Sequence, residues 1–325
     1  MPSRPITIRD VARLSQVSIG TVSRVLNQRP GVHPETRRRV LEVVERLGYT
    51  PLPAARELSG HTGTVGILLS PDVRRYTPYY ILLFERLSEA LWRQGLQLEE
   101  TPVDPTGLPL APAAGYILLG AHDHDPRLEV LRAQGVPFVL IGVYAGVFWV
   151  APDDPMGSYL ATRHLLELGH RRILHLTGHL HHQAGRERLA GYRQALLEAG
   201  IEPQPEWILD GDFSDLQAYR ALRKAWEQGV RGTALVAASD EMALGALAAL
   251  EDLGVKVPAE VSVVGFDDLP ELPIPLTTAR QEIAEIAEIA AQLLQEALAG
   301  NPPRGVRVPV RLVVRSTTAR RGGDP

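Results

Sequence analysis

From residue 62 onward, the chain alternates short uncharged apolar runs with longer stretches in which apolar residues recur at helical spacing. Runs such as VGILLS, GYILLG and TALVAAS are typical of buried strands, and YYILLFERLSEALWRQG is typical of an amphipathic helix. Strands that alternate with helices form parallel sheets covered by helices on both faces. The alternation restarts after Asp153, so the sequence predicts two doubly wound lobes. Small ligands bind at the carboxyl ends of such strands, which predicts a ligand site in the cleft between the lobes.

The run from Ala133 to Pro152 carries no charge and is long enough to be considered as a membrane span. It contains several glycines and prolines, and two buried strands joined by a turn explain it better than a spanning helix. The first ten residues include no apolar stretch of a secretory signal, so we expect a cytoplasmic protein. The chain has no cysteine, which excludes disulfides and thiolate metal sites.

Charge is distributed unevenly along the chain. Residues 1–60 contain ten arginines and five acidic residues, a net charge of +5, whereas the whole chain carries −4. A basic segment joined to an acidic body indicates an anionic partner that binds at one end only. Nucleic acid is the first candidate for this partner, and an anionic membrane surface is the second.

The basic segment has the pattern of three short helices. They are expected over Asp10–Leu14, over Ile19–Asn27 with Ser18 as N-cap, and from Pro34 to Leu47. Two helices joined by a tight turn, the second with a polar free face, form a helix-turn-helix. The major groove of B-DNA admits one such helix. The alternative for this pattern alone is any small three-helix bundle.

Several phrases resemble the lactose repressor/purine repressor family of bacterial transcription regulators. In the basic segment they are ITIRDVARLSQVSIGTVSRVLN, PETRRRVLEVVERLGYTP and AARELSG, and further on they are HLLELGHRRILHLTG, RLAGYRQAL, SDEMALGALAAL, VVGFDD and PLTTARQ. The resemblance implies a small all-α helix-turn-helix head joined to an α/β body of two doubly wound parallel-sheet lobes, similar to periplasmic sugar-binding proteins. It implies a head over residues 1–50, a hinge helix and linker over 51–61, and an effector-binding and dimerisation domain over 62–325.

The family pattern implies DNA contacts in the head. Hydroxyl and amide side chains match phosphate-contacting or capping positions, and they are Thr7, Ser18, Thr21, Ser23, Asn27 and Thr36. Ile19, Gly20 and Arg24 match base-reading positions, and Tyr49 matches a residue that contacts the DNA backbone. Ile19 can touch a thymine methyl, but Gly20 has no side chain. Much of the direct reading therefore falls to Arg24, which can bond guanine bidentately.

Three positions near the head depart from the family pattern or depend on it. Leu58 matches a leucine that wedges between base steps in the minor groove, and the alternative is a linker helix in which it simply packs. Pro51-Leu52-Pro53 replaces the family's usual Pro-Asn before this helix. Gln16 stands where the family usually has Gly in the turn, and a left-handed Gln would cost on the order of 1 kcal/mol.

The family pattern also implies an effector site in the body. Its matching residues are Tyr79, Tyr80, Arg188, Phe213, Ser239, Asp240, Asp267 and Gln281. The planar fork of Arg188 can bond vicinal hydroxyls or a carboxylate, Asp267 can accept two hydroxyl hydrogens, and Phe213 can cover the flat face of a sugar or purine. The alternatives are a structural ion pair for the charged residues and core packing for the aromatic ones. We expect a sugar or a nucleoside-like effector.

The body has a loop that departs from the family pattern and two groups of histidines to which the family pattern gives no role. Between Leu98 and Gly115 we expect a Pro-rich loop because there is no room for the usual strand-helix pair. Histidines gather at 122–124 and 179–182, and we expect ordinary loops there in preference to a zinc site. The motifs GxxxxGK[ST], GxSxG and HExxH are absent, so we predict neither an enzyme nor a cofactor.

One head makes too few contacts for tight specific binding, so we predict a homodimer on a near-palindromic DNA operator, without a membrane partner. The segment VRVPVRLVVRSTT matches the family's closing strand, and no leucine heptads follow it, which favours a dimer over a tetramer. An effector that binds one lobe arrangement better would shift DNA affinity, as an inducer or as a co-repressor. The alternatives are a ligand-binding receptor without a gene-regulatory role and a sugar-acting enzyme.

Overall fold

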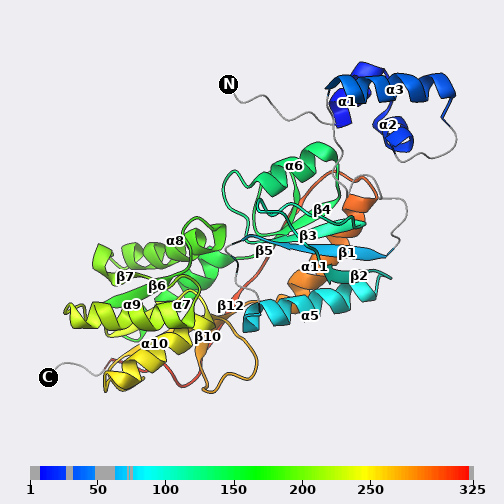
Figure 1. The fold of residues 1–325 in the computed structure, drawn as a ribbon. Coiled ribbons are helices and arrows are strands. Elements are labelled where there is room, and N and C mark those ends of the chain that lie inside the picture. The colour runs from blue at the N-terminus through cyan, green and yellow to red at the C-terminus, as the bar shows by residue number, and fades with distance from the viewer. Residues whose placement is uncertain (1–7, 27–31, 48–62, 72, 74–75, 322–325) are drawn as a thin grey trace. The chain divides into compact units, whose positions relative to one another are not determined.

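The computed structural model describes residues 8–26, 32–47, 63–71, 73 and 76–321 (Figure 1). Packing divides the chain into two compact units. Unit 1 comprises residues 1–74, 84–150 and 287–306, and unit 2 comprises residues 75–83, 151–286 and 307–325. Each unit contains one six-stranded sheet.

The head consists of α1 (Ile8–Ser15), α2 (Ile19–Leu26) and α3 (Pro34–Leu47), close to the three helices that the sequence predicts. A small core of buried valines holds them together, and it comprises Val11, Val22, Val25, Val40 and Val43. Gln16 adopts a left-handed backbone with φ of 54°, and Ser18 Oγ accepts a hydrogen bond from Thr21 N at 3.1 Å. The turn and the N-cap predicted for a helix-turn-helix are both present.

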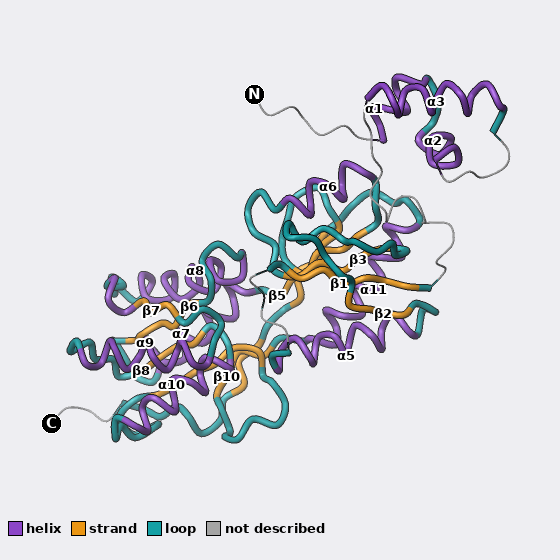
Figure 2. Tube along the Cα trace, viewed as in Figure 1, coloured by secondary structure: helices purple, strands orange, loops and turns teal. Residues whose placement is uncertain are grey.

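Unit 1 is built on a mostly parallel sheet. Its strands are β1 (Thr64–Leu69), β2 (Gln97–Glu100), β3 (Gly115–Leu119), β4 (Phe138–Ile141), β5 (Phe148–Pro152) and β11 (Gly305–Val308), in the order β11-β5-β4-β3-β1-β2. Strands β1 to β5 pair in parallel. Helix α6 (Pro126–Gln134) covers one face, and the apolar cluster beneath it includes Leu68, Leu118 and Leu140. Helices α5 (Pro78–Trp92) and α11 (Ile283–Leu298) lie on the other face in Figures 1 and 2.

Unit 2 repeats this plan. Its strands are β6 (Ile173–Thr177), β7 (Ile208–Asp210), β8 (Ala234–Ala237), β9 (Ser262–Asp267), β10 (Thr277–Arg280) and β12 (Arg311–Val313), in the order β12-β10-β9-β8-β6-β7. Its helices are α7 (Asp154–Glu167), α8 (Gln183–Glu198), α9 (Asp215–Glu227) and α10 (Asp240–Asp252), with a short 3₁₀ turn, η1 (Pro205–Trp207). Because strand side chains alternate, Leu174 and Leu176 pack with α9 and α10, whereas Ile173 packs with α7 and α8.

The predicted fold class is therefore confirmed, with one doubly wound sheet in each unit. The uncharged run over residues 133–152 forms β4 and β5, as predicted. Within the described part of the chain, no helix combines the length and the apolar character needed to cross a bilayer.

Two strand predictions are wrong. The sequence predicts no strand between α5 and β3, yet β2 forms beside β1. Only Leu98 of its four residues is buried, so it lacks the continuous apolar run that marks the other strands. The closing segment, predicted as one strand, is divided between β11 in unit 1 and β12 in unit 2. Pro309 lies between them, and proline has no N–H group to continue a ladder.

The Pro-rich loop over residues 101–114 takes the place of a helix in unit 1, as predicted. A bridge joins Val103 to Pro109, and Asp104 Oδ1 accepts hydrogen bonds from the backbone N–H groups of Thr106 and Leu108. The Tyr116 hydroxyl donates to the Ala111 carbonyl at 2.8 Å. The loop is thus fixed by its own turns, by this hydrogen bond to β3 and by the packing of Ala113 in the apolar cluster beneath α6.

Arg127 lies under this loop at the carboxyl ends of β1 and β3, the point where the strand order reverses. It pairs with Asp125 at 2.6 Å, and both side chains are 1% exposed. Its Nη atoms also donate to the carbonyls of Leu68, Leu119 and Gly120. Nε and both Nη atoms therefore all have protein partners. The usual ligand-binding position of a doubly wound sheet is occupied in unit 1 by the protein itself.

We predict that Gly107→Ala destabilises unit 1 more than Gly135→Ala does. Both glycines have positive φ, 81° and 68°, so each alanine costs about 1–2 kcal/mol of backbone strain. A Cβ at Gly107 would lie 2.9 Å from Arg127 Cδ, whereas nothing lies within 4 Å of one at Gly135. Displacing this buried stem adds roughly 1–3 kcal/mol. Urea unfolding of both variants measures the difference, and equal midpoints would contradict the contact.

Candidate functional site

The head presents the predicted base-reading residues at its surface. Ile19 is 45% exposed and Arg24 is exposed on α2, while a Cβ at Gly20 would meet only Ser18 Oγ, at 3.7 Å. Thr21 is half-buried and its hydroxyl shares a hydrogen bond of 2.9 Å with Ser18 Oγ. An exposed arginine on a short helix with a small neighbour is compatible with docking in the major groove.

Other predicted DNA contacts are only partly visible. Thr36 lies half-buried in the first turn of α3. The predicted hinge over residues 51–61, which includes Leu58, lies outside the described part of the chain. So do three other predicted DNA-contacting residues, Thr7, Asn27 and Tyr49, and the side chain of Ser23.

Unit 2 holds its candidate site at the carboxyl ends of β6 and β8, where its strand order reverses. Arg188, from α8, is only 5% exposed there. Its Nε donates to Asp154 Oδ1 at 2.7 Å, and its Nη1 donates to the Ala238 carbonyl and lies 3.6 Å from Asp267 Oδ1. Its Cζ stacks over the Phe266 ring, 3.7 Å from the centroid. Within the described residues, Nη2 has no hydrogen-bond acceptor.

Two buried carboxylates share this one guanidinium. Burial raises the pKa of Asp154 in spite of Arg188, and burial raises the pKa of Asp267 well above its ordinary value. Burial alone would lower the pKa of Arg188, but Asp154 and Asp267 outweigh it and raise that pKa. The arginine therefore stays charged, and the site is richer in acceptors than in donors.

Gln281 completes the group. Its Nε2 donates to Asp267 Oδ1, and its backbone N–H donates to the Asp267 carbonyl at 3.2 Å. The residue is 3% exposed, and its Oε1 is buried without a partner in the described structure. Asp267 itself has a positive φ of 125° at the end of β9, which turns the chain there. The second oxygen of Asp267 and Oε1 of Gln281 remain as acceptors, and Nη2 of Arg188 remains as a donor.

Phe213 lies beside this polar group. Its ring is against Gly178, at the end of β6, so closely that a Cβ there would lie 2.1 Å from ring carbons. Asp212 and Phe213 both adopt left-handed backbone, with φ of 56° and 46°. The ring centroid is 5.8 Å from Arg188 Cζ. Only glycine at 178 permits an aromatic face next to the guanidinium.

Ser239 and Asp240 have structural partners. Ser239 Oγ accepts from Met242 N at 3.1 Å and caps α10. The two oxygens of Asp240 accept from Thr278 Oγ1 and Leu269 N, and burial raises the pKa of Asp240 to about 6. These bonds hold α10, β10 and the loop after β9 together. Contact of Ser239 or Asp240 with an effector stays a prediction.

The two predicted tyrosines come from the first turn of α5, in the short segment that belongs to unit 2. Tyr79 N donates to Glu241 Oε1 at 3.2 Å, which ties this turn to α10. Burial and the charge of Asp267 raise the pKa of the Tyr79 hydroxyl, while Arg188 opposes them. Tyr79 therefore lies in the field of the same charged group, whereas Tyr80 is 3% exposed and packs as a core residue.

Asp154 is the main site residue that the sequence analysis misses. It is 1% exposed at the start of α7, and Asp153 before it caps the helix through Met156 N. A pair of aspartates before a helix is an ordinary capping signal, so the sequence alone does not indicate that Asp154 pairs with Arg188. The contact that reveals Asp154 joins residues 34 positions apart.

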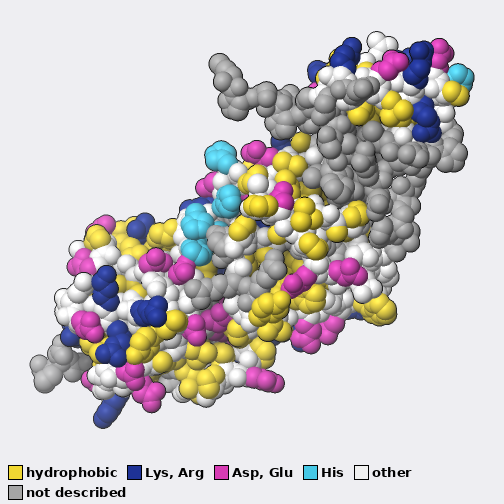
Figure 3. Space-filling model, in the orientation of Figure 1, with side chains coloured by type: hydrophobic (Ala, Val, Ile, Leu, Met, Phe, Trp, Pro, Cys, Tyr) yellow, Lys and Arg dark blue, Asp and Glu magenta, His cyan; other side chains and the backbone are white. Residues whose placement is uncertain are grey.

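Within the described part of the chain, this group has no metal site beside it. Across the residues described, no set of three histidine or acidic side chains is arranged to hold a metal ion. His122 Nδ1 instead lies 3.0 Å from the Asp123 carbonyl, and His179 pairs with Asp212. Histidine side chains are visible at the surface in Figure 3.

Comparison with known proteins places the chain among transcription regulators. The family described as "Bacterial regulatory proteins, lacI family" matches residues 7–52, and "Periplasmic binding protein-like domain" matches 162–318. The chain is 35% identical over 328 residues to the HTH-type transcriptional regulator CelR of Thermobifida fusca, covering 95% of each chain. It is 31% identical to the HTH-type transcriptional repressor PurR of Escherichia coli O1:K1 / APEC, covering 96% of this chain and 97% of the relative.

Two solved structures are similar over nearly the whole chain. A transcriptional regulator CelR–cellobiose complex has a TM-score of 0.72 at 32% identity, with 97% of this chain and 100% of that chain covered. The Lac repressor dimer bound to operator and the anti-inducer ONPF has a TM-score of 0.70 at 28% identity, with the same coverage.

We predict that Asp154→Ala lowers the free energy of unfolding by about 3 kcal/mol or more, because it leaves a buried guanidinium short of one partner. Glu187→Ala is the control, since it removes the partner of Arg307, which is 33% exposed. A pair this accessible contributes about 1 kcal/mol or less. Urea unfolding at neutral pH measures both, and a similar small loss in the two variants would refute the structural importance of Asp154.

Proposed function

The chain belongs to the LacI family of bacterial regulatory proteins, and from this premise we propose that it is a repressor whose operator affinity is set by a sugar bound at unit 2. The family prediction from the sequence motifs is confirmed. Because the relatives are named as transcriptional regulators and repressors, the role is regulatory and not enzymatic. The observation that carries the proposal is the open polar group formed by Arg188, Asp267 and Gln281 beside the ring of Phe213.

The chemistry of this group favours a neutral polyol. Hydroxyl groups both donate and accept, so one ligand can satisfy Nη2 of Arg188, the second oxygen of Asp267 and Oε1 of Gln281. An anionic ligand would lie beside the carboxyl groups of Asp154 and Asp267 and would compete with them for the single guanidinium. A flat ring face against Phe213 completes recognition of a sugar. The CelR–cellobiose complex supports the same class of effector.

We propose that the DNA contacts are made by the head and the hinge. Ile19, Gly20 and Arg24 face the bases, Ser18, Thr21, Ser23 and the other hydroxyl or amide residues hold phosphates, and Leu58 enters the minor groove. We assign residues 1–50 to the head, 51–61 to the hinge and 62–325 to the effector-binding part. An operator-binding protein works where the chromosome lies, so we place this one in the cytoplasm.

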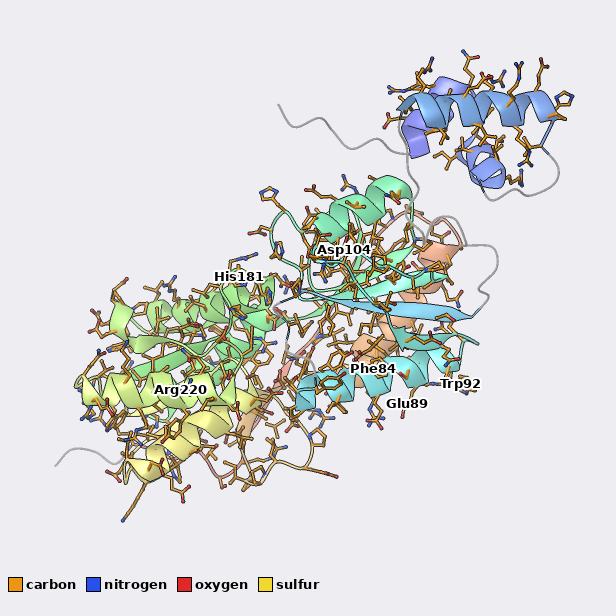
Figure 4. The ribbon with its side chains drawn as sticks, in the orientation of Figure 1. Phe84, Glu89, Trp92, Asp104, His181 and Arg220 are labelled. Atoms are coloured by element: carbon orange, nitrogen blue, oxygen red, sulfur yellow. The ribbon has the colours of Figure 1, made fainter. Side chains whose placement is uncertain are left out.

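We further propose a homodimer that carries two heads to the two halves of a near-palindromic operator. Helix α5 supports this proposal, because it carries large apolar side chains that are exposed. Ile81 is 55% exposed, Trp92 is 72% exposed, and Phe84 is half-buried. Figure 4 labels Phe84 and Trp92 on this helix. Large apolar side chains exposed on one helix are compatible with a protein interface.

We predict that Arg24→Ala weakens binding to the operator at least about 30-fold, because each of the two heads of the dimer loses one bidentate guanine contact of about 1–3 kcal/mol. Binding to unrelated duplexes falls far less, so the preference for the operator shrinks. Arg220→Ala, an exposed arginine on α9, is the control. Fluorescence anisotropy with palindromes from the protein's own promoter region measures both. Failure of the unmodified protein to bind any duplex at low salt would refute the function.

We predict that Arg188→Lys lowers effector affinity at least about tenfold, because lysine keeps the charge but loses the planar fork. Arg193→Lys, an exposed position on the same helix, is the control and keeps the affinity. A thermal-shift screen of sugars and purines finds the effector, and calorimetry then compares the variants. Unchanged affinity in Arg188→Lys, or an effector that does not alter DNA binding, would exclude the proposed site.

A further inference from the structure

Unit 2 buries more carboxyl groups than cations around its candidate site. Asp154, Asp240 and Asp267 are 1%, 0% and 3% exposed. Among the described residues of unit 2, Arg188 is the one arginine or lysine with a buried side chain. A carboxylate that loses its water without gaining a cation is costly, and such a group usually takes up a proton. The excess of carboxyl groups therefore predicts that the site holds a proton.

Two of the three carboxyl groups have partners that favour the ionised form. Asp154 Oδ1 accepts a hydrogen bond from Arg188 Nε at 2.7 Å. Charge-assisted bonds of this length are among the stronger ones in proteins. Asp240 uses both oxygens as acceptors, one for Thr278 Oγ1 at 2.6 Å and the other for Leu269 N at 2.9 Å. The proton is therefore not expected on Asp154 or Asp240.

Asp267 is compensated least. Arg188 Nη1 lies 3.6 Å from its Oδ1 and already donates to the Ala238 carbonyl. The hydrogen bond to Oδ1 comes from the side-chain amide of Gln281, which carries no charge. No group in the described structure donates a hydrogen bond to the second oxygen of Asp267. An ionised Asp267 would thus be a buried charge with one neutral donor and a distant cation.

The charged and titratable groups around Asp267 come from four helices. They are Arg188 from α8, Asp154 from α7, Asp240 and Glu241 from α10, and Tyr79 from α5. Burial raises the pKa of Asp267 well above its ordinary value, Arg188 opposes this shift only in part, and Asp240 and Glu241 add to it. These are surroundings in which an aspartic acid stays neutral at a pH where exposed ones are ionised.

We propose that Asp267 is protonated in the resting site and donates this proton in a hydrogen bond to an oxygen of the effector. Its Oδ1 keeps the hydrogen bond from Gln281, and its second oxygen becomes a donor instead of an acceptor. When the pH rises and Asp267 ionises, this donor is lost and a buried negative charge appears, so effector affinity falls. This inference rests on the proposed function of the site and adds that its response is linked to pH.

The first experiment requires no effector. The infrared C=O stretch of a protonated carboxyl group is separate from the bands of carboxylates. At neutral pH the full-length protein should show such a band, and Asp267→Asn should reduce it. Asp210→Asn changes an exposed carboxyl group of the same unit and should leave the band intact. If the band is missing, or if Asp267→Asn retains all of it, Asp267 is ionised and the proposal is overturned.

Urea unfolding at different pH values is an independent test. A carboxyl group with a raised pKa binds more protons in the folded state than in the unfolded state. Its contribution to stability therefore falls as the pH rises from about 4, the pKa of an unfolded aspartate, towards its folded pKa. Asp267→Asn removes this loss, so its urea midpoint should rise relative to that of the unmodified protein over this range. An ionised Asp267 held by Arg188 would give the opposite slope.

The third experiment tests the hydrogen bond to the effector. Glucose, ribose, lactose and cellobiose are added in turn at neutral pH, and calorimetry finds those that bind. A bound saccharide should shift the infrared band, because the carboxyl proton gains an acceptor. Its affinity should fall at least about fivefold over the pH range in which the band disappears, as expected for one lost hydrogen bond. The affinity of Asp267→Asn should not change in this way.

The outcomes separate this inference from the function on which it rests. A saccharide that binds without shifting the band overturns the donor role of Asp267, while sugar control of the repressor stands. If no saccharide binds although the band is present, the proposed sugar effector is wrong and the bound proton stands. Adenine and guanine then replace the saccharides in the same measurement, and a bound purine that leaves the band in place overturns the donor role.

Discussion

The candidate effector site depends on one buried cation that holds four elements of unit 2 in place. Arg188 extends from α8 to Asp154 on α7, to the Ala238 carbonyl after β8 and to Asp267 at the end of β9. Because uncompensated buried charge is costly, the guanidinium cannot leave this position without a replacement for its partners. Its plane is also fixed by stacking on Phe266. The open Nη2 is therefore aimed before any ligand arrives, which lowers the cost of binding.

Unit 1 also has a buried arginine at the point where its strand order reverses, but the protein itself takes all the donors of that arginine. Arg127 lies at the ends of β1 and β3, where Asp125 and three carbonyls take its donors and the Pro-rich loop covers it. Arg188 lies at the ends of β6 and β8 with one donor open. Both sheets reverse their order at these points, so either could bind a ligand. The distribution of hydrogen-bond partners explains why recognition is proposed for unit 2.

The sequence predicts elements well where burial and periodicity agree and poorly where they do not. Most helices and strands are found because apolar residues recur along them at the right spacing. Strand β2 is missed because only Leu98 in it is buried, and the split between β11 and β12 is missed because both have strand-like composition. In the site, Arg188 and Asp267 are found through family phrases. Asp154 and the open oxygen of Gln281 require the folded chain, since they depend on distant contacts.

The exposed residues of the head account for only part of the free energy by which such a protein distinguishes its operator from other DNA. If Arg24 supplies one bidentate contact in each of two heads, direct reading contributes about 2–6 kcal/mol of discrimination. Operator-binding proteins usually distinguish their sites from other DNA by about 4–10 kcal/mol. Gly20 adds no side-chain contact, and Ile19 offers only an apolar surface. The remainder must come from the energy of deforming the duplex, which is the contribution that a wedge at Leu58 would make. An effector that acts through the hinge would then change the part of the operator affinity that depends on bending the DNA. The phosphate contacts of the heads would stay largely unchanged.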